Sequence, residues 1–352
     1  MSRDYIAIAP LLRCPATHQA VQYTDRAEDF QAFIGGDADL QAITQGYLNT
    51  DRTHFYPILD GIICMMPSSA ADSLHGNVQR VRDFYNAFGW TRDEKGRYQD
   101  SRLFIEEKKD VDQYYYDTTL RALRFLKPKG RYVLDVASGP VFQEENKALS
   151  KNFDTRICVD ISIRALQEAR KNIGDQHGIF INGDITNLPL ADGVCDSVMS
   201  IHTLYHVPKE LQESGVRELL RVCQPGSNVV IFYNWAWHSW LMNAVLMPVR
   251  VVKAGQRLVR YLTKPAKDRW ISGGLYFYPH TPAWFERIAA SIPGLQVSFH
   301  SLTSIHQDFV KYYIHDTLGG SSLLRWVKNK EEKHDAYLGR HGAFGYVVFH
   351  KP

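Results

Sequence analysis

The chain has 352 residues, of which 45% are hydrophobic and 22% are charged, as in an ordinary folded globular protein. Its formal net charge of +3 is too small to indicate a DNA-binding protein. No apolar run reaches the ~20 residues of a membrane span, the first residues lack the features of a signal peptide, and five scattered cysteines favour a reducing cytoplasm.

Residues 1–75 predict a small β-rich domain. The apolar stretches "LLRCPATHQAV" and "HFYPILDGIICMMP" are short and interrupted by proline or glycine, which is typical of strands joined by turns. The small polar run at 69–78 marks the boundary to a second domain over residues 76–352. That domain begins with two predicted helices, in "QRVRDFYNAFGW" and in "DQYYYDTTLRALRFL".

From residue 131 onward, strand-like and helix-like segments alternate. Predicted strands are "RYVLDVAS", "RICVDIS", "GIFING", "CDSVMSIH" and "SNVVIFYNW", with helices in "SIRALQEARKNIG" and from Pro208 to Cys223. This alternation of nearly continuous apolar strands with helices predicts an α/β fold with a mostly parallel, doubly wound sheet. Helical insertions are expected at about 236–275 and 303–341, and "AFGYVVFHK" is expected to be an antiparallel last strand.

Small residues and carboxylates follow the first three of these strands. Ala137, Ser138 and Gly139 leave room for a ligand to approach the backbone after the first strand. Asp160 ends the second strand, where a carboxylate can accept both hydroxyls of a ribose, and Asp184 follows the third, where it can meet the amine of an adenine. The carboxyl ends of parallel strands meet at one edge, so the sequence predicts a nucleotide-cofactor site there.

This ordered set resembles the class I S-adenosylmethionine-dependent methyltransferases, closely over 131–235 and in layout over 79–350. The resemblance implies a Rossmann-like seven-stranded sheet, methyltransferase activity and S-adenosyl-L-methionine as cofactor. It implies that Asp135, Ala137, Ser138 and Gly139 contact the methionine part of the cofactor, and that Asp160 and Ile161 contact the ribose. It further implies that Asp184 and Ile185 contact the adenine, and that Ser200 and His202 lie beside the sulfonium. Tyr115 would cover the cofactor as an aromatic lid. Tyr114, Tyr115 and Tyr116 cannot all face one side of a helix, so at least one belongs to the core.

The end of the fourth strand, "SIHTLYHV", carries the candidate catalytic residues. The cofactor supplies the reactive methyl group, and a base is needed only when the acceptor atom holds a proton. His202 and His206, with Tyr205 between them, are the candidate bases, and the alternative is that they only pack or orient. No Asn/Asp-Pro-Pro-aromatic tetrapeptide stands here, which favours an oxygen or nitrogen of a small-molecule or glycan acceptor over a nucleic-acid base.

The N-terminal segment resembles the zinc-ribbon-like methyltransferase activator, through its Tyr-Pro-Ile-x-Asp-Gly-Ile core. Cys14 is followed by Pro-Ala-Thr-His instead of a second nearby cysteine, so a degenerate ribbon with an apolar core and no metal is expected. A cluster of Cys14, His18, His54 and Cys64 is the alternative. The resemblance keeps an RNA methyltransferase as a second hypothesis, although RNA is the less favoured partner. The single glycine of the cofactor loop keeps a non-catalytic scaffold as a third.

The first insertion combines tryptophans, apolar residues and basic residues. One interpretation is a helical lid over the acceptor site. Another is an interfacial helix over 236–270 that places the protein at a membrane surface, where a lipid-linked acceptor would lie. A nucleic-acid patch is the remaining alternative. The sequence sets no oligomeric state.

Overall fold

The computed structural model describes residues 4–34, 43–66, 109–263, 276–315 and 319–352. The helix predicted in "QRVRDFYNAFGW" and the boundary predicted at 69–78 lie outside these ranges.

One sheet runs through the described part of the chain, in the order β1-β2-β3-β4-β7-β6-β5-β8-β9-β11-β10. Its strands are β1 (Val21–Thr24), β2 (Gly46–Asn49), β3 (Phe55–Leu59), β4 (Ile62–Cys64), β5 (Gly130–Val136), β6 (Phe153–Asp160), β7 (Gly178–Asn182), β8 (Ser197–Ile201), β9 (Asn228–Asn234), β10 (Gln296–Thr303) and β11 (Phe344–His350). Strands β4 to β9 pair in parallel, and β11 pairs antiparallel with both β9 and β10.

The α/β class, the mostly parallel sheet and the antiparallel last strand are therefore confirmed. The predicted strand number of seven is correct for β5 to β11 and wrong for the sheet as a whole, which has 11 strands. The difference arises because β1 to β4 of the N-terminal segment join the sheet at the β7 edge. There β4 pairs with β7 through Ile63 and Ile181.

Helices cover both faces of the sheet. They are α1 (Ala27–Ile34), α5 (Lys109–Leu120), α6 (Glu144–Ala148), α7 (Ile163–Ile173), α8 (Gln212–Val222), α9 (Trp240–Val245), α10 (Met247–Thr263), α11 (Pro282–Ala290), α12 (Gln307–Tyr313), α13 (Gly320–Lys333) and α14 (Asp335–His341). Alternate residues of one strand face opposite ways. Leu134 packs in the core beneath α8 and α11, while Val133 packs in the core with the turn after α5.

The helix α7 begins and ends where the sequence predicts. The Ser162 hydroxyl accepts a hydrogen bond from the Ala165 amide at 3.2 Å, and Gly174 ends the helix with a φ of 83°. The helix after β8 begins later than expected, at Gln212, because a short 3-10 turn spans Lys209–Leu211.

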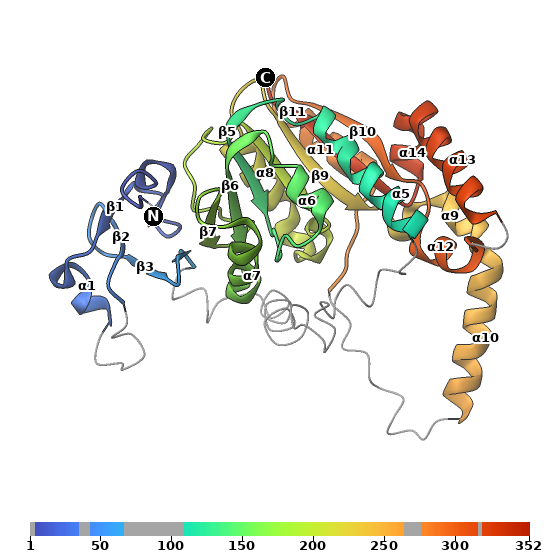
Figure 1. The fold of residues 1–352 in the computed structure, drawn as a ribbon, viewed down its shortest axis with the longest axis horizontal. Coiled ribbons are helices and arrows are strands. Elements are labelled where there is room, and N and C mark those ends of the chain that lie inside the picture. Colours follow the sequence, from blue (N-terminus) through green and yellow to red (C-terminus); the bar gives the residue numbers. More distant parts are fainter. Residues whose placement is uncertain (1–3, 35–42, 67–108, 264–275, 316–318) are drawn as a thin grey trace.

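The N-terminal strands and the inserted helices lie at opposite ends of the molecule (Figure 1). Leu12, Cys14 and Tyr56 share one hydrophobic cluster with Ile179 and Leu190, so the N-terminal segment and the sheet have a continuous core. At the other end are α9 and α10, which follow β9 in the sequence, and α12 to α14, which come between β10 and β11 in the sequence. Helix α10 extends away from the rest of this end (Figure 1). No helix of the described ranges is both long and apolar enough to span a bilayer.

Candidate cofactor and acceptor site

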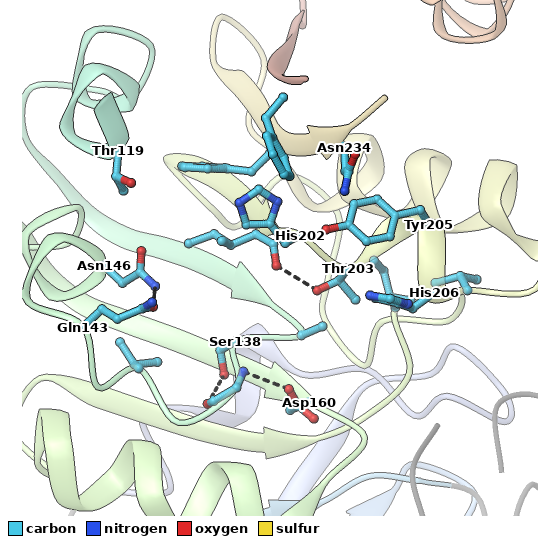
Figure 2. Close-up of a pocket in the computed structure, with 18 of the residues that line it drawn as sticks. Thr119, Ser138, Gln143, Asn146, Asp160, His202, Thr203, Tyr205, His206 and Asn234 are labelled. Carbon is cyan, nitrogen blue, oxygen red and sulfur yellow. Dashed lines mark hydrogen bonds between the residues drawn. The ribbon is translucent and has the colours of Figure 1, made fainter. Parts of the chain in front are cut away.

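A cavity of about 670 Å³ opens at the carboxyl ends of β5 to β9. Its volume falls within the ~300–1,000 Å³ that is usual for small-molecule sites. Figure 2 shows Ser138 and Asp160 on one side of the cavity, with His202, Tyr205 and Asn234 across from them. The cavity therefore lies where ligands bind in open α/β sheets.

The loop after β5 bends sharply despite its single glycine. Ala137, Gly139 and Val141 have φ values of 55°, 59° and 46°. Glycine adopts this conformation freely, whereas a β-branched valine is strained in it, and such strain gathers at ligand sites. The Ala137 amide donates to the Val159 carbonyl at 2.6 Å, which holds the loop against β6. The loop lines the cavity with Ala137, Ser138 and Gly139.

Asp160 is a buried carboxylate in the cavity wall. Its oxygens accept hydrogen bonds from the Gly139 amide at 3.0 Å and the Ser162 amide at 2.8 Å. Burial raises the pKa of Asp160 to about 6. A carboxylate has about four acceptor positions, so these backbone amides leave acceptor capacity for a further donor.

Asp184 lies at the end of the next strand, and its Oδ1 accepts a hydrogen bond from the Thr186 amide at 2.8 Å. Ile161 and Ile185 flank these two carboxylates in the cavity wall. Together they form a rim with both acceptors and apolar surface.

Asp135 and Ser200 do not line the cavity. The Asp135 carboxylate is fully buried and pairs with Arg156, whose Nη2 lies 2.5 Å from its Oδ2. Arg156 also donates to the Asn146 carbonyl at 2.5 Å. A buried guanidinium requires such a charge partner, so Asp135 ties β5 and β6 to helix α6. Ser200 is buried within β8, between β5 and β9.

His202 lies in the cavity wall at the end of β8, with a strained φ of 55°. Its ring packs edge-on against Phe344, at 5.5 Å between ring centroids. Burial lowers the pKa of His202 to about 4, and its Nδ1 has no hydrogen-bond partner in the described part of the chain.

His206 has a defined tautomer. Its Nδ1 lies 2.7 Å from the Tyr276 carbonyl oxygen, which can only accept, so Nδ1 carries the proton and Nε2 holds a lone pair. Burial lowers the pKa of His206 to about 4, and the ring is therefore neutral at neutral pH. The Tyr205 ring packs beside the His206 ring, with 4.7 Å between the ring centroids, and both side chains line the cavity.

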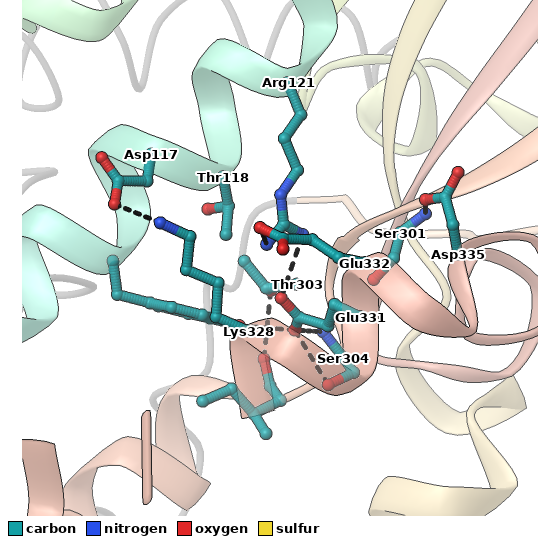
Figure 3. A network of polar contacts seen from close by, with 12 residues as sticks. Asp117, Thr118, Arg121, Ser301, Thr303, Ser304, Lys328, Glu331, Glu332 and Asp335 are labelled. Atoms are coloured by element: carbon teal, nitrogen blue, oxygen red, sulfur yellow. Dashed lines mark hydrogen bonds and ion pairs between the residues drawn. The ribbon is translucent and has the colours of Figure 1, made fainter. Parts of the chain in front are cut away.

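A buried polar network lies beside Thr118 and Thr303, two residues that line the cavity (Figure 3). Glu331 of α13 accepts hydrogen bonds from the Tyr114 hydroxyl at 2.6 Å, the Ser304 amide at 2.6 Å and Arg121 at 3.1 Å. These contacts join α5 to α13 and to the end of β10. Helix α5 turns Tyr114 into this network and Tyr115 into the cavity wall.

Comparisons with known proteins find methyltransferases, the class of enzyme that the sequence resembles. Residues 134–231 match the family model described as a methyltransferase domain. A demethylmenaquinone methyltransferase of Beutenbergia cavernae is 28% identical over 183 residues, covering 49% of this chain and 73% of the relative. One of Clavibacter sepedonicus is 31% identical over 170 residues, covering 48% of this chain and 63% of that protein, less than two thirds of its length.

Among solved structures, magnesium protoporphyrin IX methyltransferase from Synechocystis PCC 6803 with bound S-adenosylmethionine is similar. The alignment covers 78% of this chain and 97% of the Synechocystis chain, with 13% sequence identity and a TM-score of 0.45. The methyltransferase-domain match and the curated relatives show that the chain is an S-adenosylmethionine-dependent methyltransferase. The predicted activity and cofactor are confirmed.

The residues of the cavity fit this cofactor. The carboxylate of Asp160 keeps acceptor capacity toward the cavity, as a ribose requires, and the Asp184 carboxylate lies beside apolar side chains that suit an adenine. The buried Nδ1 of His202, which has no hydrogen-bond partner among the described residues, gives the same cavity a further polar atom. Asp160, Ile161, Asp184, Ile185 and the loop at 137–139 would hold the cofactor.

Several cavity residues were missed from the sequence. They are Thr118, Thr119, Phe142, Gln143, Glu145, Asn146, Thr186, Asn234, Phe277, His306, Gln307 and Phe344. Asn234 ends β9 in "FYNW", so the strand-end rule that found Asp160 and Asp184 could have found it. His306 lies in the second insertion that the sequence predicts. Neither His341 nor His280 lines the cavity, and His280 stacks on Trp284 at 4.1 Å.

No group of three or more His, Cys, Asp or Glu side chains is arranged to hold a metal in the ranges that the structure describes. Cys14, His18, His54 and Cys64 all lie within those ranges and form no such group. The Cys14 sulfur is buried, 3.1 Å from the Tyr56 hydroxyl oxygen.

Proposed function

We propose that this enzyme methylates an oxygen or nitrogen atom of a small molecule bound beside the cofactor in the same cavity. The observation that carries the proposal is that one cavity contains both the cofactor rim at Asp160 and Asp184 and a second wall of aromatic and histidine side chains. The demethylmenaquinone methyltransferases to which the chain is similar also have names that indicate a small-molecule acceptor.

The second wall favours an acceptor that is largely apolar and aromatic. It contains Phe232, Phe277, Leu302 and Phe344. Aromatic faces and edges bind flat apolar ligands well and exclude water from the reacting atoms. These four side chains cannot hydrogen-bond to hydroxyls, so this part of the cavity favours a molecule with a flat apolar face over a glycan.

We assign His206 as the proton acceptor, because its Nε2 holds a lone pair and its ring is neutral. The bound cofactor supplies an electrophilic methyl group. The Nε2 lone pair can accept the proton of a hydroxyl group on the acceptor, and a phenol or enol hydroxyl gives up its proton more readily than an aliphatic alcohol does. His202 and Tyr205 orient the acceptor beside it.

Methyl transfer with radiolabelled S-adenosylmethionine tests the proposal. Purified enzyme is incubated with a small-molecule extract, with protein-free RNA and with a polysaccharide fraction, and each is counted after removal of the cofactor. Label is expected in the organic-soluble small-molecule fraction. Label in the RNA alone, with binding that weakens steeply as salt rises, would overturn it in favour of an RNA methyltransferase.

The N-terminal segment is proposed to be a metal-free relative of the activator ribbon. Its interior is apolar, with Leu12, Cys14 and Tyr47 buried. It packs against the cofactor end of β7, where Asn187 donates to the Pro15 carbonyl at 2.8 Å. In this proposal it stabilises the loop that carries Asp184.

A further inference from the structure

Helix α10 carries apolar side chains in solvent. Met247, Val251 and Val252 are 64%, 66% and 60% exposed. At 100° per residue these three positions lie within about 140° of one another around the helix. The apolar face of a surface helix normally packs on the protein, so this exposed face indicates a binding surface.

The charges of this region all have one sign. Between Ala236 and Thr263 the sequence has four basic residues and no acidic one. The basic positions are Arg250, Lys253, Arg257 and Arg260, which lie about 100–180° around the helix from Val251. Lys253 also pairs with Asp308 of α12 at 2.7 Å, which attaches α10 to the body. The positions complement a negatively charged surface.

Two tryptophans extend the exposed apolar surface toward the cavity. Trp237 and Trp240 are 54% and 53% exposed. Ser239 between them is buried, and its hydroxyl donates to the His341 carbonyl at 2.8 Å, which fixes the turn. Tryptophan is the side chain that best suits the headgroup region of a bilayer.

The turn also contacts the acceptor wall. The Trp237 ring lies 6.0 Å from the ring of Phe277, which lines the cavity. Phe277 in turn lies 5.8 Å from the ring of His206. An unbroken row of aromatic rings therefore runs from the exposed surface to the proposed base.

We propose that Trp237, Trp240, Met247, Val251 and Val252, named here the α9–α10 surface, bind an anionic lipid bilayer. The acceptor is then an amphiphile drawn from that bilayer, an assignment that rests on the proposed function. Exposed tryptophan, exposed aliphatic residues and basic residues without acidic ones together match an interfacial helix. A second copy of the chain is the poorer fit, because a twofold contact would bring two basic helices together.

Flotation of the full-length enzyme with vesicles tests this inference. Vesicles contain phosphatidylcholine alone or with roughly a third phosphatidylglycerol. The enzyme is expected to float with the anionic vesicles, less so at high salt. The triple variant Trp240→Gln/Val251→Gln/Val252→Gln is expected to bind the anionic vesicles at least about tenfold more weakly than the unmodified enzyme does. Trp326→Gln is the matched control, because Trp326 is 57% exposed but lies on α13.

Hydrogen exchange on the unmodified enzyme gives a second readout that needs no variant. Anionic vesicles are expected to slow exchange over residues 237–259. The inference would be overturned if the enzyme neither floats with anionic vesicles nor shows this protection. It would also be overturned if the enzyme is a dimer without lipid and the triple variant is a monomer, because the α9–α10 surface would then bind a second copy of the chain. Binding of S-adenosylmethionine, measured in parallel by calorimetry, separates this result from the proposed function, which stands if the cofactor binds and a soluble acceptor is methylated.

Discussion

The Gly139 amide donates to the Asp160 carboxylate at 3.0 Å, and this bond links the loop after β5 to the end of β6. A single glycine therefore serves two purposes here. It adopts the left-handed φ that the loop needs, and its amide hydrogen-bonds to Oδ2 of Asp160, the carboxylate proposed to bind the ribose.

Asp160→Ala is expected to weaken S-adenosylmethionine binding by at least about tenfold, since hydrogen bonds to charged groups contribute about 1.5–3 kcal/mol. Calorimetric titration of the cofactor measures the effect. Asp154→Ala is the control, because Asp154 is an exposed carboxylate at the start of the same strand. Equal affinities in the two folded variants would remove Asp160 from the cofactor site.

Cofactor affinity is also expected to depend on pH. Burial raises the pKa of Asp160 to about 6, and only the ionised carboxylate accepts from two hydroxyls. Lowering the pH from 8 to 5 should therefore raise the Kd about tenfold. The histidines do not interfere in this range, because the pKa values of His202 and His206 are both about 4.

The same raised pKa links pH to stability in the cofactor-free enzyme. Protonation of Asp160 favours the folded state, so its contribution is fully present below about pH 4 and is lost as the pH rises through 6. Asp160→Asn should flatten both this dependence and that of the affinity. A wild-type Kd that is constant from pH 8 to 5 would contradict the assignment.

His206→Ala is expected to lower the rate of methyl transfer about a hundredfold or more, while cofactor affinity changes by less than about twofold. The rate falls because Nε2 of His206 is the proposed proton acceptor. His341→Gln, outside the cavity, should leave both quantities unchanged. An unchanged rate in His206→Ala would leave His206 as a packing residue and turn attention to His202.

The purified enzyme is expected to contain well under one zinc per chain. Cys14 lies against Tyr56 in an apolar interior, and the described residues bring no second ligand pair to it. Elemental analysis measures the metal content. Stoichiometric zinc that disappears in Cys14→Ser would show that the N-terminal segment is a functional ribbon.

The strands from Gly130 to Asn234 could be predicted because their apolar runs are bounded by clear turn residues. The same rule located Asp160, which ends β6, and Asp184, which lies two residues after β7. The direction of the Asp135 side chain could not be predicted, because it depends on Arg156, which lies 21 residues away in sequence but next to it in the sheet. The pairing of β4 with β7 also has no local signal.

His306 shows a second limit of the sequence. It belongs to an insertion, and it reaches the cavity because its ring stacks on Phe344 of the last strand, at 6.1 Å. That contact depends on how α12 packs against β11, and no periodicity in the sequence encodes it. Residues contributed by insertions are therefore found only from the folded chain.

Glu331→Ala is expected to lower the free energy of unfolding by about 3–5 kcal/mol, since the nearly buried Arg121 guanidinium loses its buried carboxylate partner. The Arg121 side chain is only 11% exposed and pairs with Glu331, whose side chain is fully buried. Glu332→Ala is the matched control. The Glu332 side chain is 55% exposed and touches the same arginine at 3.5 Å, so its loss should cost less than about 1 kcal/mol. Urea denaturation of both variants measures the difference, and equal midpoints would show that the network does not anchor helix α5.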